Sequence, residues 1–561
     1  MNAARPTGRR GSAAALALMA VPVTFFALFF GYPLAAIVAR GLRTDGRWEP
    51  ERFTTVLGQP GIGHVLWFTV WQALASTALT LLLALPGAYV FARLDFPGKR
   101  LLRAVVTVPF VLPTVVAGTA FLALLGHGGL LDELWGVRLD TTVWAILLAH
   151  VFFNYAVVIR TVGGLWAHLD PRQEEAARVL GASRWATWRT VTLPALAPAV
   201  AAAALMVFLF TFTSFGIVKI LGGPAYSTIE VEIYRQTADL FDLPVAAVLT
   251  LLQLLTVGAV LAVHARTVRR RERTLHLLPA GAARRPRGAA QWTLVAIVLG
   301  TVAVLLLLPL AVLVSRSLTT DDGIGTDYYR ALGSADGGVF LVPPLDALVV
   351  SLEYALAATG IAVAIGTLAA TALTLPHRRT HRPSPVERLL RGVDALLMLP
   401  LGVSAVTVGF GFLIALDEPP LDLRESWVLV PLAQALVGVP FVVRTMLPVL
   451  RAVDTRLREA ATVLGASPLR AWREVDLPMV RRALLVAAGF AGAVSLGEFG
   501  ATVFVARPDR PTLPVAVARL LGRPGELHYG QAMALSVILM ALCAAALLLL
   551  ESAGNQHTGE F

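Results

Sequence analysis

Long apolar stretches separated by short polar segments run through the whole chain. Because about 20 consecutive apolar residues are needed to cross the hydrocarbon core of a bilayer, we interpret the pattern as twelve membrane-spanning helices. The first stretch is too long for the apolar region of a signal peptide and has no clear cleavage site, so we expect it to remain as a helix. The predicted spans are 13–38, 64–92, 101–125, 141–163, 194–220, 243–264, 291–315, 345–375, 392–416, 427–448, 479–505 and 529–551.

Composition agrees with a membrane protein. Of the 561 residues, 57% are hydrophobic and only 15% are charged, and the mean hydropathy is +0.71. The net charge of +11 could suggest nucleic-acid binding, but the arginines lie in short loops between apolar stretches, so we expect no nucleic-acid partner. The predicted fold class is an all-α protein embedded in a lipid bilayer.

Arginine and lysine concentrate in every second loop, as they do in loops on the cytoplasmic side of a membrane. The loops between them are acidic, with Asp132 and Glu133 in one and Glu230 and Glu232 in another. One predicted outer loop, 40–52, is an exception because it carries four arginines. With twelve spans, this pattern predicts that both termini are cytoplasmic.

An Arg-, Pro- and Gly-rich segment divides the chain near its midpoint. The predicted domains are a first six-helix half (1–264), a basic cytoplasmic linker (265–290) and a second six-helix half (291–561). An even number of spans in each half gives both halves the same orientation. The fold is therefore expected to be two parallel-repeat bundles related by an axis along the membrane normal.

A 20-residue segment occurs twice in the chain, 284 residues apart. The first copy reads EAARVLGASRWATWRTVTLP (175–194) and the second reads EAATVLGASPLRAWREVDLP (459–478). The same offset pairs Phe215–Gly216 with Phe499–Gly500. By the charge pattern and the helix count, both copies face the cytoplasm.

Each copy has the composition of a helix–turn–helix between two membrane spans. Glu-Ala-Ala begins a short run of strong helix formers, and Gly181 or Gly465 follows it, as glycine commonly follows a helix C-terminus. A second short helix then carries Trp188 or Trp472. One interpretation is an amphipathic loop on lipid headgroups. Because the spacing recurs in two copies, we favour the other, a pair of docking surfaces for a protein.

The repeated segment resembles the EAA loop of importer-type ABC permeases, in which Glu-Ala-Ala, three residues, Gly and a closing hydrophobic–Pro pair follow one another. In that family the loop is the coupling helix that sits in a cleft of the ATPase subunit. The resemblance implies two copies of an ATPase, an extracytoplasmic solute-binding protein and a location in the cytoplasmic (inner) membrane of a bacterium. The residues that it implies for coupling are Glu175, Ala176, Ala177, Gly181, Trp188, Pro194, Glu459, Ala460, Ala461, Gly465, Trp472 and Pro478.

The chain itself lacks the motifs of an ATPase. Its two lysines, Lys99 and Lys219, do not complete the phosphate-binding pattern G-x-x-x-x-G-K-[ST]. ATP and Mg are therefore expected on the partner ATPase, with no cofactor in this chain and no enzymatic activity of its own. No His or Cys cluster predicts a metal site, and we assign the isolated His150, near a predicted helix end, to an interfacial or packing role.

Polar residues inside the membrane are candidates for the transport pathway. For Glu498, two interpretations stay open: it lines the pathway, or it lies at a helix break near the interface and pairs with an arginine. Ser214 is its counterpart in the first half. The pathway candidates are Asn154, Ser214, Phe215, Gly216, Glu498, Phe499 and Gly500.

The transported solute is ranked by resemblance. The fusion of two six-helix halves is similar to thiamine and ferric-iron permeases, and LLAHVFFN (147–154) and GGPAYSTIEVEIYRQ (222–236) resemble the thiamine type most. GEFGAT (497–502) followed by TLP (512–514) also resembles molybdate and sulfate permeases, whereas the KELP signature of ferric-iron permeases is absent. We rank thiamine or a related small cation first, ferric iron second and a molybdate- or sulfate-type oxyanion third. An ion-coupled secondary transporter with twelve helices in two parallel halves is the alternative class.

Overall fold

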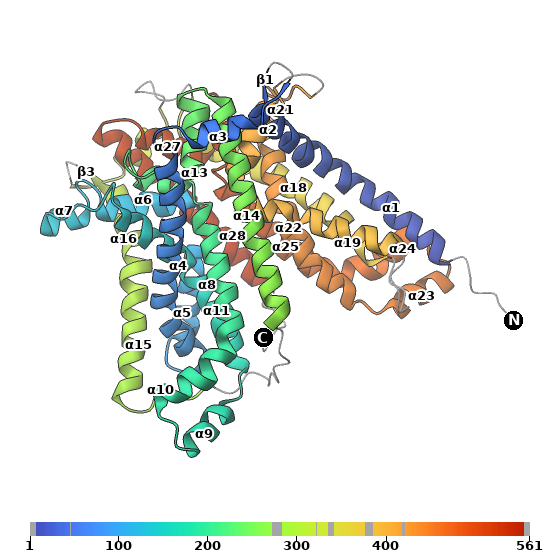
Figure 1. The fold of residues 1–561 in the computed structure, drawn as a ribbon, viewed down its shortest axis with the longest axis horizontal. Helices are drawn as coiled ribbons and strands as arrows, with labels where there is room; N and C mark the ends of the chain where they lie inside the picture. The colour runs from blue at the N-terminus through green and yellow to red at the C-terminus, as the bar shows by residue number, and fades with distance from the viewer. Residues whose placement is uncertain are drawn as a thin grey trace. The chain divides into compact units, whose positions relative to one another are not determined.

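The computed structural model describes residues 7–44, 47–271, 283–320, 323–334, 342–375, 385–417 and 421–554. Nearly all of these residues are helical (Figure 1), which confirms the predicted all-α class. The strands within them form two short antiparallel pairs: β1 (Arg43–Thr44) with β2 (Arg47–Trp48), and β3 (Thr319–Thr320) with β4 (Gly323–Ile324). Residues 272–282 of the predicted linker and 376–384 of a predicted basic loop lie outside the described residues.

The described residues include eleven helices that are long and apolar enough to cross a membrane, and a shorter apolar helix at Ala405–Ala415. This agrees with the prediction of about twelve spans. The eleven helices are Ala14–Leu42, Ile62–Arg93, Thr114–Trp135, Val143–His168, Arg184–Phe212, Leu243–Val263, Ala289–Leu318, Asp346–Thr374, Leu429–Ala452, Pro468–Gly497 and Glu526–Ala546.

The chain forms two compact units. The first-half unit comprises Pro50–Tyr329 and Pro524–Val537, and the second-half unit comprises the rest. Segments labelled η are π-helical. The first-half unit contains α3 (Glu51–Leu57), α4 (Ile62–Arg93), α5 (Lys99–Val111), α6 (Thr114–Leu125), α7 (Leu130–Trp135), α8 (Val143–His168), α9 (Pro171–Val179), α10 (Arg184–Thr187), η2 (Trp188–Thr192), α11 (Leu193–Phe212), α12 (Gly216–Leu221), α13 (Ile229–Tyr234), η3 (Arg235–Asp239), α14 (Leu243–Arg271), α15 (Ala289–Thr301), η4 (Val302–Leu307), α16 (Leu308–Leu318), the beginning of α17 (Asp327–Ala331) and the beginning of α28 (Glu526–Gly554).

The second-half unit contains α1 (Thr7–Phe26), η1 (Ala27–Gly31), α2 (Tyr32–Leu42), α18 (Asp346–Thr374), α19 (Pro385–Leu397), α20 (Leu399–Gly402), α21 (Ala405–Ala415), α22 (Leu429–Ala452), α23 (Thr455–Val463), α24 (Pro468–Ala471), η5 (Trp472–Asp476), α25 (Leu477–Gly497), α26 (Thr502–Val505), α27 (Leu513–Leu521) and the remainder of α28.

The first span of each half packs in the unit named after the other half. In the second-half unit, α1 contributes Met19 and Phe26 to the core that α18 and α22 build. Gly411 of α21 lets α2 approach closely, because a Cβ at that glycine would lie 3.0 Å from Cβ of Pro33. In the first-half unit, α15 packs on α4 and α16 packs on α6. The predicted boundaries 1–264 and 291–561 remain our description of the duplicated sequence, and the compact units cut across them.

Several predicted spans are interrupted helices. The predicted span 101–125 is α5 followed by α6, because Pro113 precedes the first turn of α6 and favours an extended conformation at Leu112, whose ψ is 143°. The predicted span 392–416 is likewise divided, and the Ser404 side chain accepts a hydrogen bond from the N–H of Val406 at the start of α21. These breaks make α5 and α19 separate helices that precede the apolar α6 and α21.

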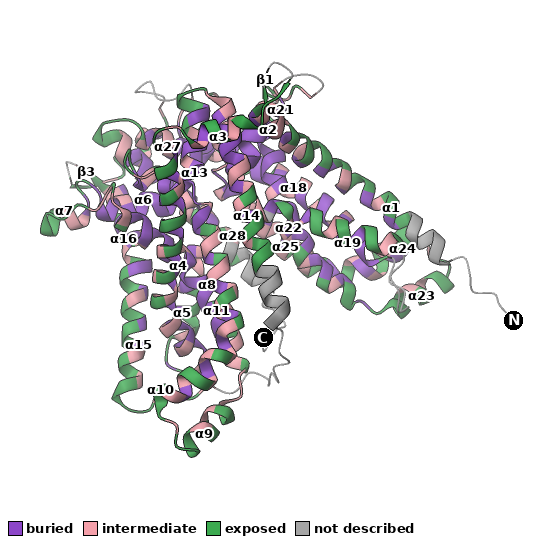
Figure 2. Ribbon diagram, in the orientation of Figure 1, coloured by how far each residue is buried: buried purple, intermediate pink, exposed green. Residues whose placement is uncertain are grey.

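Burial distinguishes central helices from peripheral ones. Helices α8 and α22 carry buried residues along most of their length, whereas α15 buries only Val295 and Val298 (Figure 2). Apolar side chains on the exposed faces suit contact with lipid, because acyl chains are as apolar as leucine.

Candidate functional site

The first copy of the repeated segment folds as a helix–turn–helix. Helix α9 begins at Pro171, where the Asp170 side chain caps it by accepting a hydrogen bond from the N–H of Arg172. The helix ends at Val179, and Gly181 follows with a left-handed φ of +90°, which costs a residue with a Cβ about 1–2 kcal/mol. Ser183 then caps α10 by accepting a hydrogen bond from the N–H of Ala186.

The second copy repeats this geometry residue for residue. Asp454 caps α23 through the N–H of Arg456, and Gly465 ends the helix at a φ of +84°. In both copies, three backbone hydrogen bonds close the helix end, and the last of them joins Ala182 to Ala177 or Ala466 to Ala461. The predicted helix–turn–helix is therefore present twice. Glu175 and Glu459 do not begin the helices as expected; each lies at the fifth residue, because the aspartate caps come earlier.

Large apolar side chains are exposed at the same positions of both copies. Val179 and Leu180 are 88% and 87% exposed, and Val463 and Leu464 are 86% and 87% exposed. Trp185 and its counterpart Leu469 are both 67% exposed. Exposed apolar surfaces of this kind are typical of protein or membrane contact sites. Sequence reasoning missed these side chains, and their position directly before each glycine was the available signal.

The predicted aromatic positions are less exposed than expected. Trp188 and Trp472 are both half-buried, and Trp188 stacks on Trp185 with ring centroids 5.1 Å apart. Each tryptophan begins a π-helical segment that leads into a Leu-Pro pair. The wider turn places Pro194 and Pro478, which lack an N–H, where an α-helical hydrogen bond is not required.

A tether joins each docking helix to the base of the next membrane span. In the first copy, the Thr192 hydroxyl donates a hydrogen bond to Glu174 over 3.0 Å. In the second copy, Nε of Arg458 donates to Oδ1 of Asp476 over 2.7 Å. Glu174 and Arg458 are equivalent by the 284-residue offset, as are Thr192 and Asp476. The two copies therefore hold the same geometry with different chemistry.

Six of the seven pathway candidates lie at helix breaks at the far ends of these spans. Helix α11 ends at Phe212. Ser214 and Phe215 lie between it and α12, and Gly216 begins α12. The Ser214 hydroxyl lies 2.9 Å from Nε2 of His150, and Nδ1 of His150 lies 2.9 Å from the Ser76 hydroxyl. His150 is in the interior of α8 rather than near its end, so it joins α4 and α8 to the break after α11 instead of serving only as packing.

Asn154 lies one turn after His150 and donates a hydrogen bond to the His150 carbonyl. It is buried, and with His150 it places a polar stripe on α8 beside the break.

The equivalent break in the second half contains Glu498, Phe499 and Gly500. The Glu498 side chain is buried and accepts hydrogen bonds from the N–H groups of Ala501 (2.7 Å) and Thr502 (2.9 Å) and from the Thr502 hydroxyl. Among the described residues, no arginine forms an ion pair with it. The carboxylate therefore caps the break itself, and its role in a pathway stays a prediction.

Comparison with known proteins identifies the class of this fold. Residues 84–273 match the family described as the binding-protein-dependent transport system inner membrane component. The thiamine transport system permease protein ThiP of Brucella abortus (strain 2308) is 27% identical over 509 residues, which cover 88% of each chain. ThiP of Salmonella typhimurium is 27% identical over 95% of this chain and 96% of its own, and ThiP of Escherichia coli K12 is 28% identical over 82% and 83%.

The chain is a permease of the ABC importer family. As such it is a multi-pass protein of the bacterial inner membrane, and permeases of this family work with an ATPase subunit and a binding protein. The membership replaces the alternative of an ion-coupled secondary transporter. A solved structure of a bacterial ABC transporter that imports alginate covers 46% of this permease and 95% of the matched chain, at 16% identity and a TM-score of 0.37.

The segments that begin α13 and α27 also make matched contacts. The N–H of Ile229, which begins α13, donates to the Thr69 hydroxyl over 2.9 Å. The N–H of Leu513, which begins α27, donates to the Ser351 hydroxyl over 2.7 Å. Within the first-half unit, Figure 1 shows α9 and α10 at one end and α13 at the other. The first helix–turn–helix and α13 are thus separated by the length of the membrane helices.

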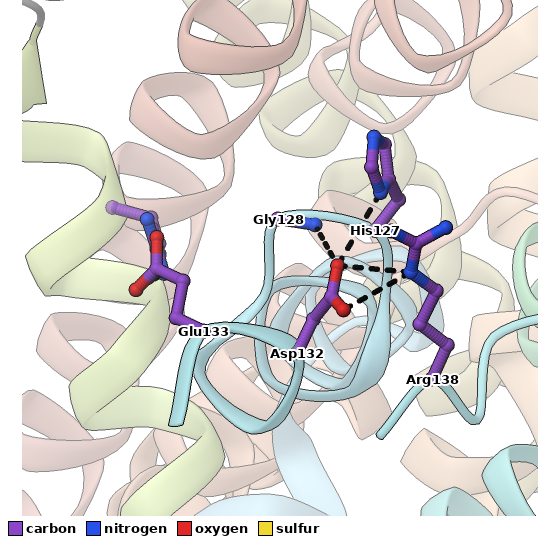
Figure 3. Close-up of polar contacts among 6 residues, drawn as sticks. His127, Gly128, Asp132, Glu133 and Arg138 are labelled. Carbon is purple, nitrogen blue, oxygen red and sulfur yellow. Dashed lines mark hydrogen bonds and ion pairs between the residues drawn. The ribbon is translucent and has the colours of Figure 1, made fainter. Parts of the chain in front are cut away.

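Charged residues hold the segment between α6 and α8 in place. Asp132 accepts hydrogen bonds from the N–H of Gly128 (2.9 Å) and Nε of Arg138 (3.0 Å), and it lies 3.3 Å from Nδ1 of His127 (Figure 3). Glu133 forms an ion pair with Arg316 over 2.5 Å. These contacts fix α7 beside α16 in the permease.

A cavity of about 540 Å³ in the second-half unit is lined by the end of α21, the start of α22 and the segment that follows α26. The Phe412 and Phe504 side chains line it beside two ion pairs, Asp417 with Arg424 and Arg507 with Asp509. The Arg507 hydrogen bond to Asp509 holds the pKa of that carboxyl below its usual range. Four charged side chains around this cavity are therefore paired with one another.

Proposed function

We propose that this permease imports thiamine or a related small cation, and that its two helix–turn–helix segments each bind one copy of a separate ATPase. The observation that carries the proposal is the matched pair of exposed apolar surfaces. In both copies, two large side chains nearly 90% exposed precede a left-handed glycine. A pair of equal surfaces suits a pair of equal partners.

A single helix connects each dock to a helix break, and the coupling proposal rests on this connection. Helix α11 has 20 residues and therefore spans about 30 Å at 1.5 Å per residue. It begins beside the Glu174–Thr192 tether and ends at the Ser214 break. Helix α25 connects the Arg458–Asp476 tether to the Glu498 break in the same way. A displacement of either dock would be carried along a rigid helix to the break, which is where we place the pathway residues.

The ATPase is expected to bind ATP and Mg, and this permease is expected to bind neither. When ATP closes the two ATPase copies, they would draw the docks together and rock the two halves. The chain's own residues have two tasks in this scheme: Val179–Leu180 and Val463–Leu464 fill the partner clefts, and the tethers transmit their movement.

The orientation proposal places both docks and both termini in the cytoplasm. The arginine-rich loops support it, because arginine and lysine favour the cytoplasmic side. Trp67 of α4 is 65% exposed, Trp144 of α8 is 60% exposed and Trp427, just before α22, is 49% exposed. Because tryptophan is enriched at both membrane interfaces, these three side chains suit the interface opposite the docks.

Thiamine is proposed because the ThiP proteins, which are named thiamine transport system permeases, are similar to this chain over most of its length. The test is uptake into proteoliposomes that contain the permease, its ATPase and its binding protein. Labelled thiamine should accumulate only with ATP, and ferric iron and molybdate should not. Accumulation of iron or molybdate, but not thiamine, would replace the proposed solute while leaving the coupling proposal intact.

The docks are tested separately from the solute. Leu180→Asp and Leu464→Asp place a charge on side chains that contact solvent, so the fold should be unaffected. Each variant should lose one of two ATPase copies, as measured by the mass of the purified complex. Two bound copies in the double variant would contradict the assignment of these segments as docks.

A further inference from the structure

The linker between the two halves reaches the first docking helix. The N–H of Arg284 donates to the Arg93 carbonyl, and the N–H of Asp95 donates to the Arg284 carbonyl, each over 3.0 Å. Leu94 and Arg284 therefore form a parallel bridge at the end of α4. Lys99 fixes the same loop by donating to the Leu94 carbonyl over 2.6 Å. The described end of the linker is thus attached by its backbone to the first-half unit.

This attachment places the Arg284 guanidinium 3.6 Å from the Glu175 carboxylate. Glu175 and Val179 are one turn apart on α9, and residues four apart share a helix face. Arg284 therefore lies beside the apolar surface that we assign to the ATPase. A partner that covers Val179 must either contact this ion pair or separate it.

Among the described residues, the second dock lacks an equivalent ion pair. Glu459 is equivalent to Glu175 by the 284-residue offset, and it is exposed. Across the ranges that the structure describes, no cation forms an ion pair with Glu459. The linker segment that carries Arg284 occurs once in the chain, because it joins the two halves.

We propose that the Arg284 guanidinium pairs with the Glu175 carboxylate on the first docking helix, so that two identical ATPase copies bind to two docks that differ. This inference rests on the proposed ATPase docking. A donor in the ATPase cleft that satisfies the unpaired Glu459 must displace Arg284 before it can satisfy Glu175. The first dock therefore binds the ATPase more weakly, and the second dock is occupied first.

The size of the difference follows from exposure. Arg284 and Glu175 have side chains that are 69% and 58% exposed, and exposed ion pairs contribute about 0.2–1 kcal/mol. Removing Arg284 should therefore strengthen ATPase binding at the first dock by at most about five-fold. The gain should shrink in 1 M salt, where the screening length is about 3 Å.

The experiment isolates the first dock with Leu464→Asp in the full-length permease, reconstituted in lipid nanodiscs, and titrates the purified ATPase subunit. Arg284→Ala should lower the dissociation constant about two- to five-fold in this background. Arg285→Ala is the matched control, because Arg285 is an adjacent exposed arginine that makes no ion pair among the described residues. With Leu180→Asp in place of Leu464→Asp, Arg284→Ala should change nothing.

Two kinds of failure are distinguishable. An unchanged or higher dissociation constant for Arg284→Ala at the isolated first dock overturns the linker inference while the docks stand. If the double variant Leu180→Asp, Leu464→Asp binds the ATPase like the unmodified permease, the docks themselves are wrong, and the linker inference is overturned with them.

Discussion

The tether between Arg458 and Asp476 gives the most specific prediction. The Asp476 side chain is only 8% exposed, and Arg458 is 23% exposed. Arg458→Ala would leave the buried carboxylate without this partner, at a cost of about 1–3 kcal/mol. If the ATPase binds only the ordered loop, its affinity for the second dock should fall by about five- to 150-fold, since each 1.4 kcal/mol is a factor of ten.

The chain supplies its own rescue variant. Arg458→Glu together with Asp476→Thr copies the Glu174–Thr192 pair of the first dock onto the second. This double variant should restore most of the affinity that Arg458→Ala loses, although it reverses the charge of one position and removes the charge of the other. A charge requirement of the ATPase would instead make the double variant the weaker of the two.

The assay isolates the second dock with Leu180→Asp and titrates the ATPase subunit, with hydrogen exchange of residues 455–476 as an independent measure of loop order. Unchanged affinity and unchanged exchange in Arg458→Ala would refute the reasoning that the tether positions the dock. Reduced affinity with normal exchange would show that Arg458 contacts the ATPase directly, and would also remove the positioning argument.

Three further outcomes are expected. Gly181→Val or Gly465→Val should release one ATPase copy while the permease stays in the membrane, because a β-branched residue at a left-handed φ should shift the turn. Full retention of the ATPase in a pull-down of either variant would argue against this role of the glycines. His150→Ala should reduce thermal stability in detergent by about 0.6–2 kcal/mol per lost hydrogen bond, and His150→Gln should reduce it less. Equal stability of the unmodified protein and both variants would contradict a stabilising role for the two His150 hydrogen bonds. Because the pKa of Asp509 is lowered by Arg507, their ion pair should persist from pH 8 to 5 and be lost only below about pH 4. The assay is the mobility of a spin label at residue 506 in an A506C, C543A background. A rise in its mobility already at pH 6 would refute this prediction.

The sequence allowed the spans, the duplication and the docking loops to be predicted because each depends on local pattern. Apolar length predicts a membrane helix, and the glycine after α9 or α23 predicts the helix end. The tethers were not predicted, because Glu174 and Thr192 are 18 residues apart and meet only when the π-helical turn has formed.

Other features depend on contacts between distant segments. Pro113 gave a local signal for the division of the third span, but the exchange of α1 and α15 between units depends on packing that no local pattern records. The role of Glu498 was open for the same reason. A carboxylate in an apolar stretch is consistent with a pathway residue, an ion pair or a cap, and only the positions of the Ala501 and Thr502 N–H groups distinguish the cap.

The packing of α1 in the second-half unit has a consequence for biosynthesis. Phe26, at the end of α1, packs in a core whose members beyond the first span begin at Val350. At about 5–20 residues per second, the ribosome needs roughly 15–65 s to make the intervening segment. During that time the first helix is in the membrane before its packing partners exist. The interval exposes α1 to lipid, chaperones and membrane proteases, so early degradation should be most sensitive to substitutions on the face of α1 that carries Met19 and Phe26.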